Sequence, residues 1–354
     1  DACVPSKALL RAAKAYRSVQ HAREFGVQPG TITFSFSDVM KYKDQAVQSI
    51  TGGGEFGERY EKIFRSLGVE VKKGKAVFLD AQTIEVNGEL LRGKTFVIAT
   101  GSVEFIPQIS GLERVKFLRS KDVMRLKRQP KAVAIIGGGP VGCEIATFFA
   151  SFGTRVVLLQ SAPFVLHRED QEISLLAREA LGHLKIEVLT SANVVEAVNG
   201  GGVYGLQVDV GGNRTMHAVE QIIVAAGKRA NTQGLGLEEL GVKLDPHGNI
   251  LTSAEQRANV SSVFAAGDVD GGMQFTHTAH HEGFVAGTNA ALVAKKKRTP
   301  RLKSDERVVP RCTFIDPEVA SVGMTQMKVS DAYGKTLVGR YPISALGRSI
   351  TDHT

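Results

Sequence analysis

The clearest pattern of apolar and polar positions lies in the middle of the chain. Residues 132–136, Ala-Val-Ala-Ile-Ile, form an unbroken apolar run of the kind that is buried in a parallel sheet. A glycine-rich turn follows at 137–142, then a helical pattern over 143–152 that Gly153 ends, and then a second apolar run over 155–159. This order predicts a strand–turn–helix–strand unit.

Shorter patterns precede this unit. A helix is predicted over residues 6–14, and a polar helical stretch over about 37–67 is broken by a glycine run at 52–54. Because helical patterns alternate with apolar strand patterns, we predict an α/β fold. Asn87-Gly88 predicts a hairpin turn between two of the short strands. These strands are predicted at 69–71, 76–79, 83–86 and 95–99.

The composition is that of an ordinary globular protein, with 354 residues, 43% hydrophobic and 23% charged. No apolar run is long enough to span a bilayer, so we expect no membrane span. Three cysteines do not make a disulfide framework, which favours a cytoplasmic location. The net charge of +8 raises the question of nucleic acid. However, the densest basic run, 295–298, has no interleaved aromatic residues, and we expect a solvated linker and no nucleic-acid partner.

The first candidate site is the turn Gly-Gly-Gly-Pro-Val-Gly at 137–142, which fits a GxGxxG pattern between a strand and a helix. Gly137, Gly139 and Gly142 would let the backbone approach a pyrophosphate at the N-terminus of the helix. We therefore predict a dinucleotide site. The alternative is a glycine-rich turn that only packs an α/β core.

The second strand of this unit ends at Gln160, where an Asp or Glu would favour NAD and a nearby Arg would favour NADP. Gln160 fits neither case. His167 and Arg168 are close enough in sequence to meet a 2′-phosphate, although Glu169 and Asp170 dilute that positive charge. The sequence leans slightly to NADPH, with NADH left open.

Cys3 lies just before the predicted helix at 6–14. A helix N-terminus stabilises negative charge and lowers the pKa of a thiol. The functional interpretation is a reactive thiolate, and the alternative is a small buried residue. Cys143 and Cys312 are interpreted as packing residues. Three histidines, His277, His280 and His281, are interpreted as surface residues of a helix, and no metal site is predicted.

Three further strings have a strand that runs into a turn of small residues. Residues 96–102 contain Thr100-Gly101, residues 222–227 end in Gly227, and residues 263–269 contain Gly267-Asp268. Taken with Cys-Val-Pro-Ser-Lys at 3–7, they resemble the flavin-dependent pyridine nucleotide–disulfide oxidoreductases. That family includes dihydrolipoamide dehydrogenase, glutathione reductase and mercuric reductase. Residues 274–279 and 311–318 look nearest to the mercuric-reductase-like branch.

The resemblance implies roles for individual residues. Cys3 would be the flavin-facing member of a CxxxxC redox pair whose other cysteine precedes the visible start. Lys7 would lie near the flavin and pair with Glu144, because a buried lysine needs a carboxylate. Asp268 would bind the ribityl chain of FAD, and Ala279 would present helix N–H groups to the flavin. The other implied cofactor-binding residues are Thr100, Gly101, Gly227 and Gly267.

For the domains, the resemblance implies two Rossmann-like dinucleotide-binding domains, one for FAD and one for NAD(P), and a partial α+β dimerisation domain. The FAD domain would comprise residues 1–129 and 229–307, the NAD(P) domain 130–228, and the partial dimerisation domain 308–354. The family's first βαβ unit and the C-terminal half of its dimerisation domain have no counterpart in these residues. We therefore expect a fragment truncated at both ends.

The implied activity is a relay in a homodimer. Hydride would pass from NAD(P)H through FAD to the cysteine pair, and from there to a thiol, disulfide or lipoyl-type substrate or to Hg(II). Ala2 stands where the family usually has glycine, which puts the shape of the redox loop in question. Two alternatives stay open: a flavin NAD(P)H dehydrogenase or oxidase without a working disulfide, and a non-catalytic nucleotide-sensing flavoprotein.

Overall fold

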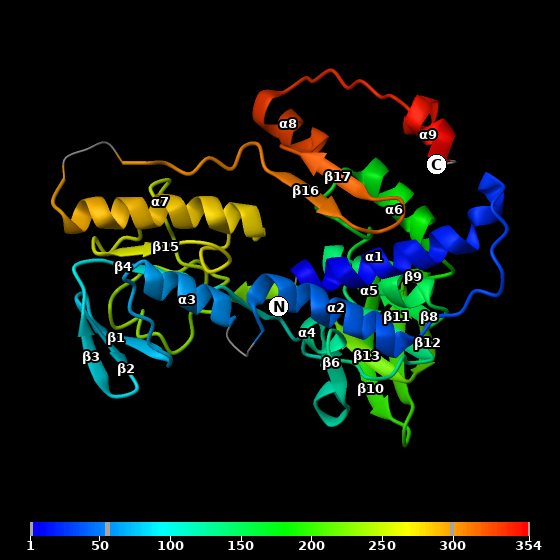
Figure 1. The fold of residues 1–354 in the computed structure, drawn as a ribbon, viewed down its shortest axis with the longest axis horizontal. Coiled ribbons are helices and arrows are strands. Elements are labelled where there is room, and N and C mark those ends of the chain that lie inside the picture. The colour runs from blue at the N-terminus through cyan, green and yellow to red at the C-terminus, as the bar shows by residue number, and fades with distance from the viewer. Residues whose placement is uncertain (1–2, 54–56, 298–300, 353–354) are drawn as a thin grey trace. The chain divides into compact units, whose positions relative to one another are not determined.

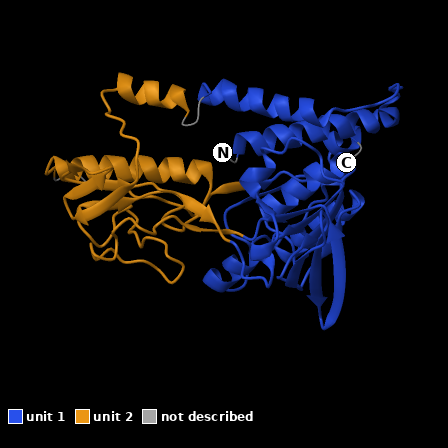
Figure 2. Ribbon diagram, turned by 90° about the horizontal axis from the view of Figure 1, so that it is seen from below, with its two compact units in different colours: residues 1–55, 106–226, 312–354 blue, residues 56–105, 227–311 orange. Residues whose placement is uncertain are grey.

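The computed structural model describes residues 3–53, 57–297 and 301–352. Ala2 and Arg298, the last residue of the basic run, therefore lie outside the described residues. The chain divides into two compact units (Figure 2). Unit 1 comprises residues 1–55, 106–226 and 312–354, and unit 2 comprises residues 56–105 and 227–311. The predicted α/β class is confirmed, because both units combine helices with parallel strands.

Unit 1 is built on a five-stranded parallel sheet with the strand order β6-β13-β7-β8-β9. Its central strand, β7, is buried on both faces because every residue from Val133 to Ile136 is apolar. The strand order reverses beside β7, which is where open α/β sheets bind ligands. The strands are β6 (Phe117–Arg119), β7 (Ala132–Ile136), β8 (Arg155–Leu159), β9 (Glu187–Leu189) and β13 (Gln221–Val224).

The central prediction of strand, turn, helix and strand is confirmed. Strands β7 and β8 have the predicted bounds, and α5 (Pro140–Ser151) begins three residues before the predicted start. The earlier start has a local reason: Pro140 occupies the first helical turn, where its missing N–H has no helical acceptor to lose. The turn at 137–142 thus directly joins β7 to α5.

Helix α1 (Cys3–Gln20) packs against α5 through aromatic side chains. The rings of Tyr16 and Phe152 are stacked with centroids 5.3 Å apart. The described helix already includes Cys3, so the predicted start at residue 6 is wrong. Residues 3–6 have helical backbone, and the Ser6 hydroxyl donates to the Cys3 carbonyl at 3.2 Å. Cys3 therefore lies within the helix rather than before it.

The remaining elements of unit 1 surround this core (Figure 1). An antiparallel sheet, β10-β11-β12, turns tightly at Gly211-Gly212, where both residues have positive φ. The strands are β10 (Ala192–Asn199), β11 (Tyr204–Val210), β12 (Asn213–Val219) and β17 (Val319–Val322), and β16 (Pro310–Thr313) begins in the last two residues of unit 2. The helices are η1 (Ala22–Phe25), α2 (Phe36–Thr51), η2 (Leu112–Arg114), α4 (Ser120–Val123), α6 (Gln171–His183), α8 (Gln326–Tyr333), η3 (Ile343–Ala345) and α9 (Gly347–Asp352).

Unit 2 holds the parallel pair β4 and β15, the antiparallel pair β5 and β14, and an antiparallel sheet β1-β2-β3. The hairpin predicted at Asn87-Gly88 is confirmed, with φ of 52° and 84° at the two residues. The elements are α3 (Glu58–Ser66), β1 (Ala76–Asp80), β2 (Thr83–Val86), β3 (Glu89–Arg92), β4 (Phe96–Ile98), β5 (Ser102–Glu104), β14 (Lys228–Ala230), β15 (Val263–Ala265) and α7 (Thr276–Ala294).

The strand predicted at 69–71 is wrong, because that segment has no strand partner and is irregular. Its alternation of apolar and charged residues is too short to fix a strand without a neighbour, and half of the Val69 side chain is exposed. Gly52 and Gly53, the described residues of the glycine run, interrupt the helical stretch as predicted, and Gly54 lies outside the described residues. Gly52 ends α2 in the left-handed conformation that favours glycine, with φ of 77°.

Candidate active site

The first part of the candidate site is the turn between β7 and α5 in unit 1. Gly137 has a φ of 116°, and a Cβ there would lie 2.3 Å from the carbonyl oxygen of Ala225. A Cβ at Gly142 would lie 1.8 Å from the carbonyl oxygen of Gly137. Only glycine fits these two positions, and the turn can therefore stay tight against the sheet.

Gly139 differs from its neighbours. It caps α5 with an extended backbone, and a Cβ there would meet nothing within 4 Å. The space beside Gly139 is thus open to a ligand, while the N-terminal N–H groups of α5 favour an anion. The residues fit a dinucleotide pyrophosphate at this turn.

Gln160, at the end of β8, supports the same turn. Its Oε1 accepts the N–H of Gly138 at 2.8 Å, and the residue is buried. The side-chain carbonyl is therefore directed at the turn. His167 and Arg168 are exposed and lie in the loop that follows β8.

The second part of the site lies on α1 and α5. Lys7 Nζ is 2.7 Å from Glu144 Oε2 and 2.8 Å from Oε1. The Glu144 side chain is 7% exposed, against 37% for Lys7. Phe314 completes the arrangement, since its N–H donates to Glu144 Oε1 at 3.1 Å and its ring lies 4.7 Å from Lys7 Nζ. Both oxygens of the Glu144 carboxylate thus accept hydrogen bonds, and the Lys7 ammonium group is held in one place.

Cys3 is exposed and lies one helical turn before Lys7 on α1. Residues four apart share one face of a helix, so the thiol and the ammonium group lie on the same side. Cys143, in contrast, is completely buried, and burial raises its pKa to about 12. Burial also raises the pKa of the Cys312 thiol, and the nearby Glu318 and Glu144 charges add to the effect. Packing is the role that burial supports for Cys143.

Unit 2 contains the other predicted cofactor residues. Strands β4 and β15 are parallel neighbours, so their carboxyl ends lie at one edge, where Thr100-Gly101 and Gly267-Asp268 follow them. Asp268 Oδ2 accepts the Ser102 hydroxyl at 2.6 Å and lies 3.3 Å from Lys228 Nζ. Sequence analysis did not find these two partners of Asp268, because they come from β5 and β14 and only the fold brings them to it.

Turns of unusual backbone conformation accompany Asp268. Gly101, Gly227 and Gly267 have φ of 69°, 121° and 78°. Thr100 donates its hydroxyl to the Asn231 carbonyl at 2.8 Å. Such turns hold the chain where larger side chains would block a bound molecule.

Ala279 lies in the first turn of α7, but its N–H donates to the Phe275 carbonyl at 2.9 Å. That N–H is therefore engaged inside the helix. His277 stacks on Phe275, and all three predicted surface histidines of α7 are exposed. No group of three metal-binding side chains occurs among the residues that the structure describes.

Glu282 is the residue that sequence analysis missed in this unit. It lies on α7 with 1% of its surface exposed, and its Oε2 accepts the N–H of Gly267 at 2.6 Å. A lone acid directly after two exposed histidines gives no sign of burial in the sequence. Only the packing of α7 shows it.

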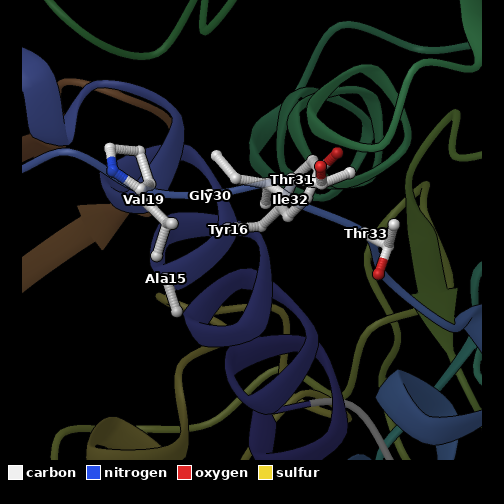
Figure 3. A pocket seen from close by; sticks show the side chains of 8 residues that line it. Ala15, Tyr16, Val19, Gly30, Thr31, Ile32 and Thr33 are labelled. Carbon is white, nitrogen blue, oxygen red and sulfur yellow. The ribbon is translucent and has the colours of Figure 1, made fainter.

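A surface hollow in unit 1 carries no titratable group except Tyr16 (Figure 3). It lies between the middle of α1 and residues 29–33. Its nearest α1 residue to Cys3, Ala15, is twelve positions further on, or about 18 Å along the helix axis. We assign no chemistry to it.

The comparisons with known proteins agree with these features. The family model described as pyridine nucleotide-disulphide oxidoreductase matches residues 1–283, and the model of that family's dimerisation domain matches residues 309–354. The chain therefore belongs to the pyridine nucleotide-disulphide oxidoreductases. Members of this family are FAD-dependent and use NAD(P)H.

Curated relatives include two kinds of enzyme. A mercuric reductase from Staphylococcus aureus is 31% identical over 351 residues, which cover 99% of this chain and 62% of that protein. A dihydrolipoyl dehydrogenase from Geobacillus stearothermophilus is 31% identical over 353 residues, covering 98% and 72%. The chain thus spans less than two thirds of the length of the mercuric reductase.

A solved structure of the HOCl-induced flavoprotein disulfide reductase RclA from Escherichia coli has the same fold. The TM-score is 0.79 at 24% identity, with 99% of this chain and 74% of that chain covered. None of the helices in the described part of this chain is both long and apolar enough to cross a membrane.

Proposed function

We propose that the protein containing this chain is an FAD-dependent NAD(P)H:disulfide-type oxidoreductase in which Cys3 is the thiol next to the flavin. The observation that carries this proposal is the arrangement on α1: Cys3 and Lys7 share a helix face, and buried Glu144 holds Lys7 at 2.7 Å. An isolated buried carboxylate would be costly, so the pair keeps a positive charge fixed one turn from the thiol.

The residues divide by task. Gly137, Gly139 and Gly142 would hold the pyrophosphate of NAD(P)H, while His167 and Arg168 would face its ribose end. This arrangement supports the lean to NADPH, because Gln160 offers no carboxylate to a ribose hydroxyl and its carbonyl already binds Gly138. Gly227 would lie in the turn after the NAD(P) domain's last strand.

FAD would be held by the second set of residues: Asp268 at the ribityl chain, with Gly267, Thr100 and Gly101 at the adjoining turns and Ala279 at the start of α7. When bound there, FAD would supply hydride acceptance from NAD(P)H and two-electron reduction of a disulfide. Two electrons convert one disulfide to two thiols, of which Cys3 would be one. Lys7 would stabilise the thiolate form of Cys3 during exchange with substrate.

By cofactor, we propose an FAD domain over 1–129 and 229–307, an NAD(P) domain over 130–228, and a partial dimerisation domain over 308–354. These domains are defined by the cofactor that each would bind, whereas the two compact units are defined by internal packing. The domain boundaries and the unit boundaries therefore fall at different residues. The match at residues 309–354 supports a homodimer. Three cysteines do not make a disulfide framework, which supports the proposed cytoplasmic location.

The substrate class is a thiol–disulfide pair or Hg(II). Relatives named dihydrolipoyl dehydrogenase and mercuric reductase support the two options at equal identity. A thiolate that exchanges with disulfides also binds soft metal ions, so Cys3 suits both chemistries.

The test is an anaerobic titration of the full-length protein with NADPH and then NADH, followed by visible absorption. We expect a long-wavelength band, which marks a thiolate lying against oxidised flavin, and we expect Cys3→Ser to abolish it. Cys312→Ser is the matched control and should keep the band. Bleaching of the flavin without the band in the wild type would instead indicate a flavin dehydrogenase without a disulfide step. A protein with no flavin spectrum would overturn the proposal.

A further inference from the structure

Glu282 is an unusual residue for the interior of a protein. It is 1% exposed, and its Oε2 accepts the N–H of Gly267 at 2.6 Å. Its other oxygen, Oε1, is buried and has no hydrogen-bond donor among the described residues. A buried carboxylate with an orphan oxygen is costly unless something satisfies that oxygen.

The group that faces Oε1 is another carboxyl. A Cβ built on Gly272 would lie 3.4 Å from Glu282 Oε1 and 3.1 Å from Glu306 Oε1, so both acids reach the same point beside the loop that follows β15. Two carboxyl groups hydrogen-bond to each other only when one of them carries a proton. The orphan oxygen is therefore where a proton belongs.

The other groups around this pair do not supply a compensating positive charge. Asp268 and Asp270 come from the loop after β15, and Thr278 lies one turn earlier on α7. The amide of Gln256, in the orientation that satisfies both its ends, donates to Asp270 Oδ2 at 2.9 Å. Lys228 binds Asp268 at 3.3 Å, and Arg307, which follows Glu306 in the chain, binds Asp305 at 2.6 Å, so both cations already have carboxylate partners.

The pKa values of the acids in this cluster also indicate that Glu282 carries a proton. Burial, and after it the hydrogen bond with Glu306 and the charge of Asp270, raise the pKa of Glu282 to about 8. Burial likewise raises the pKa of Asp270 to about 6. At neutral pH the Glu282 carboxyl holds its proton.

We infer that Glu282 is a positioning residue that works in its protonated form. Its Oε1–H donates to the Glu306 carboxylate, and its Oε2 accepts the N–H of Gly267, which immediately precedes Asp268. The proton thus ties α7, the segment after α7 and the turn of Asp268 together. Loss of this proton places two negative charges side by side, and the turn that presents Asp268 loosens. The link to FAD rests on the proposed function, whereas the shared proton does not.

The first test is thermal unfolding of the full-length protein without added FAD, as a function of pH. Because folding raises the pKa of Glu282, the native state holds one extra proton between about pH 4.5 and pH 8, and stability falls as pH rises through that range. The variant Glu282→Gln accepts from Gly267 and donates to Glu306 at every pH. We expect the free energy of unfolding of this variant to fall less steeply with pH than that of the wild type, by the slope that one bound proton contributes. Glu239→Gln, an exposed acid of the same unit, is the matched control and should follow the wild type.

The second test is the FAD dissociation constant of the full-length protein at pH 6.5 and pH 9.5, measured by flavin fluorescence. We expect about a tenfold weakening in the wild type as the proton is lost, and less than about a twofold change in Glu282→Gln. Glu282→Ala should bind FAD weakly at both pH values.

The two tests distinguish failure of the shared-proton inference from failure of the proposed function. Unfolding curves of Glu282→Gln that keep the full pH dependence of the wild type would overturn the inference. Equal weakening of the Gln and Ala variants at all pH values would also overturn it, because a proton would then play no part. If the wild type binds no FAD, the proposed function fails, and the unfolding curves alone decide on the shared proton.

Discussion

At the scale of single residues, the ion pair of Lys7 and Glu144 is asymmetric. Glu144 is buried and Lys7 is partly exposed, so replacing Lys7 and replacing Glu144 leave charges in different surroundings. Removal of Lys7 leaves a buried charge without its cation. The main contribution of the pair to stability is therefore that it keeps the buried Glu144 carboxylate from being left without a cation.

We expect Lys7→Met to destabilise the native state by about 2 kcal/mol, below the full cost of breaking a buried pair because Lys7 is partly in water. Lys14→Met is the matched control on the same helix. Its pair with Glu318 is exposed on both sides, so the change should be below about 1 kcal/mol. Denaturant unfolding of both variants measures the difference, and equal effects would contradict the burial argument.

The cysteines differ in what reagents can reach. Burial raises the pKa of Cys143 to about 12, so this thiol stays protonated and enclosed at pH 7–9. We expect iodoacetamide to modify Cys3 in the native protein and to reach Cys143 only after unfolding. Peptide mass spectrometry over this pH range checks the order. Modification of Cys143 in the native protein that rises with pH would show that its surroundings open.

At the scale of elements, the turn from β7 to α5 depends on glycine for two separate reasons. Gly137 needs both its positive φ and its lack of a Cβ, and Gly142 lies against the Gly137 carbonyl. Gly139 is sterically free, and we propose that it leaves space for a ligand. The motif GxGxxG would then combine folding and binding requirements.

Gly137→Ala should cost roughly 2 kcal/mol or more in stability and abolish NAD(P)H binding, because the new Cβ would clash with the Ala225 carbonyl. Gly182→Ala is the control, since this exposed glycine of α6 has ordinary helical backbone and open space around it. It should raise stability by about 0.5–1 kcal/mol. Calorimetry and nucleotide binding of the pair measure both effects, and a stable, nucleotide-binding Gly137→Ala protein would refute the steric argument.

At the scale of the whole molecule, residues 309–352 present many apolar side chains to solvent. Leu337 is 99% exposed, Tyr333 72% and Met327 69%. A set of this size on one segment is typical of a surface that is covered by another chain. The match to the dimerisation-domain model supports the proposal that this other chain is a second copy.

We expect Met327→Glu combined with Tyr333→Glu to shift the full-length protein from dimer to monomer, because buried acids without partners oppose association. Sedimentation velocity at several concentrations measures the shift. Lys335→Glu, a charge change on the same segment, is the control for net charge. A double variant that remains dimeric would place the interface elsewhere.

The sequence by itself predicted the α/β class, strands β7 and β8, the glycine turn and the pairing of Lys7 with Glu144 that the family resemblance implies. The strands and the turn follow from local rules, because unbroken apolar runs are buried strands and glycine marks positions that exclude a Cβ. The ion pair came from the resemblance alone. The start of α1 and the strand at 69–71 were wrong. In both cases the local sequence pattern was weak, and contacts with other segments of the chain determined the secondary structure.

Only the tertiary structure showed the partners of Asp268 and the burial of Glu282. Ser102 and Lys228 are far from Asp268 in sequence, and strand pairing brings β5 and β14 together beside it. Glu282 has the composition of a surface position, but the face of α7 that contacts β15 encloses it. Burial and the approach of like charges are properties of packing, and one-dimensional patterns do not contain them.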